Sequence, residues 1–296
     1  MKESKKPVET DGAIIWYEKP KLNNPIFLAT FEGWNDAGDA GSDEYDPRLI
    51  GEISGEDYLD YQQLRPNIIV NEEGIREVSW PSNEISLVSI PGSNHDIIIL
   101  NAFEPNYKWK SFSQDVIKIL TTFNCEEAFT FGSLLAEVPH TRPTRLTGIA
   151  TDKDRLNALE VLPSNYQGPT GIVGILHAAF QEKGINSTSL WAAVPHYVTQ
   201  SPQPSAINEL LNTFGALIGI DFDTSLIALR TQKWVDDVSE AIEDDDEASS
   251  YVADLEERFD AGDISEGFDM MPEELPNAGS IVSEVEQFLR DQPDEK

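Results

Sequence analysis

The sequence predicts an α/β fold in which short buried strands alternate with helices. Runs of four to seven residues rich in Ile, Val and Phe have the length and composition of strands. Between them, apolar residues recur at helical spacing, most clearly over Trp109–Phe123. This alternation indicates a parallel or mostly parallel sheet with helices on both faces.

Each expected element has a local signal in the chain. The strands are expected at 25–31, Asn67–Val70, 85–90, 96–102, 127–132, Leu146–Ala150 and 189–194. The helices are expected at Trp109–Phe123, 170–183 and Pro204–Ile218. In the second helix, Thr170 is the expected N-cap and Gly184 ends the helical pattern.

The end of the chain is predicted to be a helical, acidic extension. Residues 228–296 contain 22 acidic and 5 basic residues. A long helix or helix pair is expected at 226–259, a linker at 262–277 and a short amphipathic helix at 281–290. We therefore divide the chain into a lead-in at 1–21, an α/β domain at 22–224 and an acidic helical tail at 225–296. Apolar residues within the tail suggest a seam packed on the core or on a neighbouring subunit: Trp234, Val238, Ile242, Tyr251 and Leu255.

Composition excludes several classes of partner. The 296 residues carry a formal net charge of −32, which disfavours nucleic acids and anionic membrane surfaces. No apolar run has the length of a secretory signal or a membrane span. The single cysteine, Cys125, cannot form an intrachain disulfide. A cytoplasmic location is expected.

Two strand exits hold the strongest functional signal. The first is Val138-Pro139-His140-Thr141-Arg142-Pro143, and the second is Val194-Pro195-His196-Tyr197. Loops leaving the carboxyl ends of strands bind ligands and partners in open α/β sheets. A histidine there can act as acid, base or ligand, and Arg142 can pair with an anionic group. We expect both exits, and the Asn35-Asp36 turn, to share one rim.

The sequence does not supply a nucleophile or a metal site to accompany these histidines. There is no G-x-S-x-G motif, Cys125 lies near a helix end, and no third metal ligand has a recognisable spacing. No metal and no cofactor are therefore expected. His177 lies within a helix pattern and is expected to be structural, while His95 lies in a polar turn.

Three further segments are candidates for the same rim. Trp34, Asn35 and Asp36 lie in a glycine-containing turn that lacks the G-x-G-x-x-G spacing, so Asn35 or Asp36 could simply cap the next element. A helix start at Gly168-Pro169-Thr170-Gly171 could attract an anion or be an ordinary N-terminus. Glu104 follows another strand; the alternative there is that Asn106 caps a helix and Trp109 belongs to the core.

Taken together, these segments resemble the PAC2 (proteasome assembly chaperone 2) family, and most closely its actinobacterial branch. The matching motifs lie in order between residues 22 and 221. They are Phe31-Glu32-Gly33-Trp34-Asn35-Asp36-Ala37-Gly38, Gly51-Glu52-Ile53 with Tyr58-Leu59-Asp60-Tyr61 and Arg65-Pro66, Glu104-Pro105-Asn106 with Trp109, Tyr166-Gln167-Gly168-Pro169-Thr170-Gly171-Ile172, and the two histidine segments. Trp234 and Leu255-Glu256-Glu257-Arg258 resemble the helical tail of that branch.

The resemblance implies a three-layer α/β/α sandwich similar to nucleoside phosphorylases, self-association into a homo-oligomer and, by extension, a role in protein assembly. Eukaryotic and archaeal relatives help to assemble proteasomes. Two departures stand out. Proteasome-binding relatives often end in a hydrophobic–Tyr–any tripeptide, whereas this chain ends Asp294-Glu295-Lys296, and the segment at 40–47 is shorter than the relatives' crossover helix.

Two functional hypotheses follow. The first is a non-enzymatic binding or assembly protein whose partners are copies of itself and proteasome subunits or another protein. The second is a hydrolase or phosphorylase acting on a nucleoside-like ligand, with His140 or His196 as acid–base. The missing nucleophile and the absence of a basic phosphate site favour the first.

Overall fold

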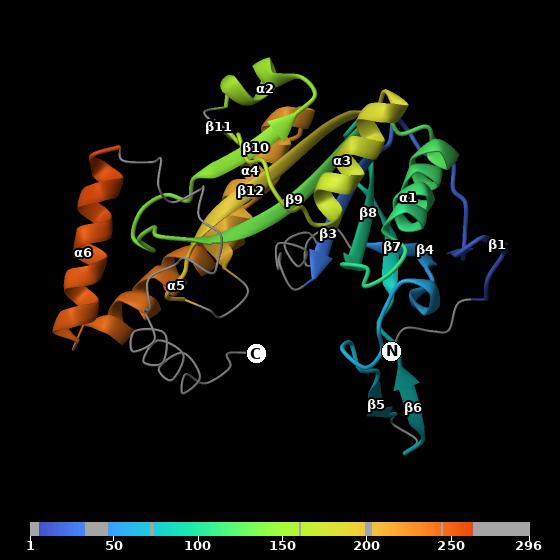
Figure 1. Cartoon of the computed structure of the whole chain (residues 1–296), viewed down its shortest axis with the longest axis horizontal. Coiled ribbons are helices and arrows are strands. Elements are labelled where there is room, and N and C mark those ends of the chain that lie inside the picture. The colour runs from blue at the N-terminus through green and yellow to red at the C-terminus, as the bar shows by residue number, and fades with distance from the viewer. Residues whose placement is uncertain are drawn as a thin grey trace. The chain divides into compact units, whose positions relative to one another are not determined.

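A computed structural model describes residues 6–32, 47–71, 74–159, 161–198, 203–243 and 245–262 (Figure 1). The predicted features at Trp34, Asn35 and Asp36, at 40–46 and at 281–290 lie outside these residues. Among the residues described, none of the helices combines the length and the apolar content that a membrane span requires.

A large mixed sheet with flanking helices forms the centre of the fold. Its ten strands run in the order β1-β2-β4-β7-β8-β3-β9-β12-β10-β11. Strand β3 is parallel to β8 and β9, but β1, β2, β4, β7 and β8 pair antiparallel in succession. The expectation of a mostly parallel sheet is therefore wrong for this side of the sheet, because short turns rather than crossover helices join several of these strands. The strands are β1 (Glu9–Asp11), β2 (Ile14–Trp16), β3 (Ile26–Glu32), β4 (Arg48–Ile53), β7 (Asn83–Ser89), β8 (Asp96–Phe103), β9 (Glu127–Ala136), β10 (Leu146–Ala150), β11 (Leu162–Pro163) and β12 (Asn186–Pro195).

The chain divides into two compact units, and the first comprises Met1–Phe131, Ala150–Asp152 and Gly168–Ser189. Helices α1 (Trp109–Phe123) and α3 (Ile172–Lys183) contribute the apolar faces that cover its strands. Edge-to-face aromatic pairs join these layers, Phe27 with Phe180 and Trp16 with Phe123. Strands β5 (Asn67–Val70) and β6 (Arg76–Ser79) stand apart from the main sheet as a two-stranded hairpin, shown at the foot of Figure 1.

The second unit comprises Gly132–Ile149, Lys153–Gln167 and Leu190–Lys296. It contains α2 (Lys153–Asn157), α4 (Pro204–Ile218), α5 (Ser225–Ile242) and α6 (Asp246–Asp260). Helices α5 and α6 bury one apolar cluster against the exit of β12: Tyr197, Val198, Val238, Ile242, Ala248, Val252 and Leu255. The segment expected as a long helix or helix pair is thus a pair. The division into a domain at 22–224 and a tail at 225–296 stays a prediction.

The start of α3 differs from the sequence expectation. Its N-cap is Gly171, whose extended backbone precedes the first helical residue, and the hydroxyl of Thr170 donates to the Gly171 carbonyl instead of capping. Gly184 ends the helix with φ +70°, a left-handed conformation that glycine adopts without strain. Helices α1 and α4 have the predicted bounds.

Candidate functional site

Both histidine segments lie at one end of two neighbouring strands. Strand β9 ends at Ala136 and β12 ends at Pro195, and these strands are adjacent in the sheet. The backbone N–H of His196 donates to the Ala136 carbonyl over 3.1 Å, which joins the two exits directly. The structure therefore brings His140 and His196 to the same end of the second unit.

His140 is buried, and hydrogen bonds engage both of its ring nitrogens. Its Nδ1 lies 2.8 Å from the hydroxyl of Tyr197, and its Nε2 lies 3.0 Å from the hydroxyl of Ser239 on α5. The backbone N–H of His140 also donates to the Tyr197 hydroxyl over 2.8 Å. Burial lowers the pKa of His140 to about 4, and the nearby Glu256 carboxylate only partly opposes this shift. The ring is thus neutral near pH 7.

His196 is held in a similar way by α6. Its Nδ1 donates to the Ala136 carbonyl over 3.1 Å, which leaves Nε2 as the acceptor, 3.3 Å from the hydroxyl of Tyr251. The ring also packs edge-to-face on Tyr197 and Tyr251, with centroids 5.8 Å and 5.9 Å away. Burial lowers the pKa of His196 as well. His140 therefore anchors α5, and His196 anchors α6.

Arg142 forms an ionic clamp on α6. Its Nε and one terminal nitrogen donate to the two oxygens of Asp260, both over 3.0 Å, and the other terminal nitrogen donates to Glu256 over 3.0 Å. The Thr141 hydroxyl also donates to Glu256. These bonds lower the pKa of Asp260. Arg142 is thus already bound to two carboxylates of its own chain.

A second set of contacts continues along the same helix. The Arg258 guanidinium lies 3.3 Å from a carboxylate oxygen of Glu137, and the Arg145 guanidinium lies 3.8 Å above the ring of Phe259. Sequence reasoning missed Glu137 and the acidic partners of Arg142. The apolar spacing of the tail did indicate the packing, since Val238, Ile242 and Leu255 are buried in the seam.

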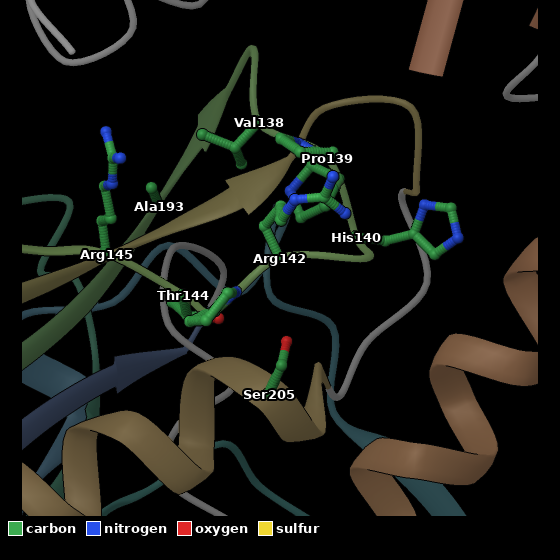
Figure 2. A pocket seen from close by; sticks show the side chains of 10 residues that line it. Val138, Pro139, His140, Arg142, Thr144, Arg145, Ala193 and Ser205 are labelled. Carbon is green, nitrogen blue, oxygen red and sulfur yellow. The ribbon is translucent and has the colours of Figure 1, made fainter. Parts of the chain in front are cut away.

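The hollow beside these groups is small. It contains about 230 Å³ of empty space, part of which is open to solvent. Figure 2 shows Thr144 and Ser205 facing each other across it, whereas the side chains of Arg145 and His140 point away in different directions. Pockets for drug-sized ligands occupy about 300–1,000 Å³. Within the described ranges, no group of three or more His, Cys, Asp or Glu residues could hold a metal ion.

In the first unit, the Glu104 carboxylate contacts the start of α3. One oxygen of the Glu104 carboxylate accepts the backbone N–H of Ile172 over 2.8 Å. A Cβ atom at Gly171 would lie 2.8 Å from that oxygen, so a side chain there would crowd the carboxylate. Gly168 and Thr170 lie exposed just before this helix start. The anion at the helix N-terminus is therefore the protein's own carboxylate.

The alternative expected around Glu104 is wrong in part. Asn106 does not cap α1, because its side-chain oxygen accepts the backbone N–H of Asp60 over 2.8 Å. Trp109 is half-buried and packs against the core, and its indole N–H donates to the Pro105 carbonyl.

His177 is part of a buried polar network. Its Nε2 lies 3.0 Å from the Thr130 hydroxyl and its Nδ1 lies 3.0 Å from the Ser187 hydroxyl. The Thr130 hydroxyl also donates to Ser189 over 2.9 Å. Burial lowers the pKa of His177 to about 4. This geometry agrees with a structural histidine.

Comparison with known proteins places the chain among relatives. The family model described as the PAC2 family matches residues 30–242. The chain belongs to the PAC2 family. It matches none of the functionally curated proteins searched.

Three solved structures indicate how far the likeness to other PAC2 proteins extends. A PAC2 family protein from Streptomyces avermitilis is 35% identical, with TM-score 0.69 over 77% of this chain and 99% of that one. A Mycobacterium tuberculosis proteasome-assembly chaperone homologue is 34% identical, with the same TM-score and coverage. The archaeal proteasome activator PbaB from Pyrococcus furiosus is 16% identical, with TM-score 0.60 over 78% of this chain and 98% of that one, and it shares the fold.

Proposed function

We propose that this PAC2 protein binds other protein subunits and assists their assembly without catalysing a reaction. Its relatives include a proteasome-assembly chaperone homologue and an archaeal proteasome activator. Proteasome subunits are therefore the first partners to test, in the cytoplasm where such subunits are found. Copies of the same chain are the second proposed partner.

The observation that carries this proposal is the engagement of both candidate acid–base residues. The ring nitrogens of His140 contact Tyr197 and Ser239, and those of His196 contact Ala136 and Tyr251. A general base needs a free nitrogen within reach of a substrate proton. These rings instead hold α5 and α6 in place, which supports a structural role.

The hydrolase or phosphorylase hypothesis draws no support from the geometry. Arg142, the cation nearest to the histidines in sequence, is bound to Asp260 and Glu256 rather than left to meet a phosphate. The hollow beside it, with about 230 Å³ of empty space, lies below the range of about 300–1,000 Å³ that is typical of small-molecule sites. We therefore do not put this hypothesis forward as a second function.

We further propose that part of the predicted rim binds partners indirectly, by positioning the acidic helices α5 and α6 that cover it. His140, Thr141, Arg142, His196 and Tyr197 fix the position of the acidic helices, so that a partner approaching this edge meets α5 and α6. Trp34, Asn35 and Asp36, with Glu104, Gly168, Thr170 and Gly171, remain proposed as the rest of the binding rim.

Assembly of the proteasome tests this function. Purified α- and β-subunits from the source organism are mixed with and without the full chain, and the formation of intermediates is followed by native gel electrophoresis. We expect the chain to enter an intermediate complex and to accelerate assembly. No complex and an unchanged rate would contradict the proposal.

A thermal-shift screen with a metabolite library provides the opposing test. A metabolite that raises the melting temperature of the wild type but not that of His140→Ala would favour an enzyme. Because His140→Ala also removes two internal hydrogen bonds, the control is His95→Ala, which removes the contacts of a half-buried turn histidine with Asn24.

A further inference from the structure

The hairpin formed by β5 and β6 exposes an apolar surface on both of its faces. Six large side chains, each 49–59% exposed, belong to or adjoin it: Ile68, Ile69, Val70, Ile75, Val78 and Trp80. An isolated two-stranded hairpin is at best marginally stable in water, whereas three or more strands with an apolar face are stable. Among the described residues, β5 pairs with β6 alone. The hairpin therefore lacks the third strand that would stabilise it.

The ladder shows which backbone groups face outwards. The Asn71 N–H donates to the Ile75 carbonyl, and the register pairs Val70 with Arg76, Ile69 with Glu77 and Ile68 with Val78. Hydrogen-bonded and non-hydrogen-bonded pairs alternate along antiparallel strands. The N–H and C=O groups of Ile68 and Val70 therefore point to the outer edge of β5.

We propose that the outer edge of β5 pairs antiparallel with β5 of a second copy of this chain, centred on Ile69. A two-fold axis perpendicular to the sheet then places Ile69 opposite its own copy, and Ile68 opposite Val70. Because Ile68 and Val70 both present outward N–H and C=O groups, this register forms four backbone hydrogen bonds. The two hairpins become one four-stranded sheet.

The distribution of charge favours pairing between two copies through β5 rather than through β6. The chain carries a net charge of −32, yet Asn67–Val70 contains no charged residue, so pairing through β5 places no like charges directly opposite each other. Pairing through β6 in the equivalent register would place Glu77 opposite Glu77, and like charges in that position are destabilising. The β5 edge is therefore the self-complementary one.

The side chains also match across the axis. Ile68 and Val70 lie on one face together with Val78, so the joined sheet has six apolar side chains on that face, three from each copy. Ile69 meets its copy on the other face at the close spacing of a non-hydrogen-bonded pair. The contact is short, so we expect a reversible dimer whose population depends on concentration.

Cysteine cross-linking tests the register. Cα atoms of a non-hydrogen-bonded pair lie about 4.5 Å apart, within the range that a disulfide spans. We expect Ile69→Cys to form a disulfide-linked dimer under mild oxidation, and Ile68→Cys or Val70→Cys to do so only when the two are mixed. The native Cys125 is buried and is present in every variant. Equal cross-linking of all three single variants would overturn the proposed register.

Sedimentation equilibrium of the full chain tests the interface independently of any proteasome partner. We expect Ile69→Lys to raise the dissociation constant more than about tenfold, because two ammonium groups would meet at the axis. Val70→Pro removes an outward N–H without touching the hairpin's own bonds, and should have the same effect. Leu229→Lys, at an exposed leucine of α5, is the control. A wild type that stays monomeric at all concentrations, or an Ile69→Lys variant that associates unchanged, would overturn the proposal.

Discussion

The hydroxyl oxygen of Tyr197 lies 2.8 Å from both the backbone nitrogen and the Nδ1 atom of His140. These two residues follow different strands, and their side chains are both buried. This pair joins the segments that follow β9 and β12. Hydrogen bonds from these two segments fix α5 and α6.

Removing the Tyr197 hydroxyl should destabilise the protein. Tyr197→Phe leaves a buried N–H and a buried ring nitrogen without a partner, a loss of about 1–3 kcal/mol in the free energy of unfolding. Urea denaturation measures it. Tyr107→Phe, which changes an exposed tyrosine bonded to Asp60, should have little effect. An equal loss of unfolding free energy in the two variants would show that the buried contact of Tyr197 with His140 contributes no more than an exposed hydrogen bond.

Acid should destabilise the folded chain through its buried histidines. Burial lowers the pKa of His140 and of His177 to about 4, below the value of about 6.5 in the unfolded chain. Their contribution is constant above pH 6.5 and is lost as the pH falls toward 4, by about 1.4 kcal/mol per pH unit for each histidine.

The slope of unfolding free energy against pH isolates one of these groups. Carboxylates titrate in the same range, but their contribution is common to the wild type and to His177→Asn. We expect the slope of the variant to be smaller than that of the wild type by about 1.4 kcal/mol per pH unit between pH 6 and pH 4.5, because one fewer proton is taken up on unfolding. Identical slopes would mean that His177 binds its proton equally well in the folded and the unfolded chain.

The Arg142 clamp should control the docking of α6. Arg142→Gln removes the bonds to Asp260 and Glu256, and we expect faster hydrogen exchange of the α6 amides while the amides of α1 stay unchanged. The matched control is Lys233→Gln, which removes an ion pair with Asp237 within α5. Unchanged exchange in α6 would show that apolar packing alone holds it.

Glu104 should contribute to stability as a helix cap. Glu104→Ala leaves the Ile172 N–H without its acceptor and should cost about 1 kcal/mol. Glu104→Gln retains an acceptor oxygen and should recover part of this loss. Thermal melting compares both with Glu126→Ala on an exposed site. A Glu104→Ala variant as stable as the wild type would contradict the capping role.

The sequence predicts those elements whose signal is local. Helices α1 and α4 begin and end where their apolar spacing predicts. The start of α3 was not predictable, because the carboxylate that caps it comes from Glu104, 68 residues away. Strands β1 and β2 were not predicted, because each has only three residues, and β4 was not predicted either. Strands β7 and β8 were predicted, but their antiparallel pairing was not.

The candidate site shows the same division. A histidine after a strand and a proline can be recognised in the chain, and the two exits do lie together at one end of β9 and β12. The sequence did not predict that α6 contacts these exits through Arg142, because its partners Glu256 and Asp260 lie more than 110 residues away. Even so, the apolar spacing of Val238, Ile242 and Leu255 indicated a packed seam.

Size-exclusion chromatography of the full chain with purified proteasome α-subunits tests the central claim most directly. If the protein is an assembly factor, the mixture should elute earlier than either component, and His95→Ala should behave as the wild type does. Separate elution at all ratios, together with a metabolite that stabilises the wild type but not His140→Ala, would contradict the claim and return His140 to the role of a catalytic group.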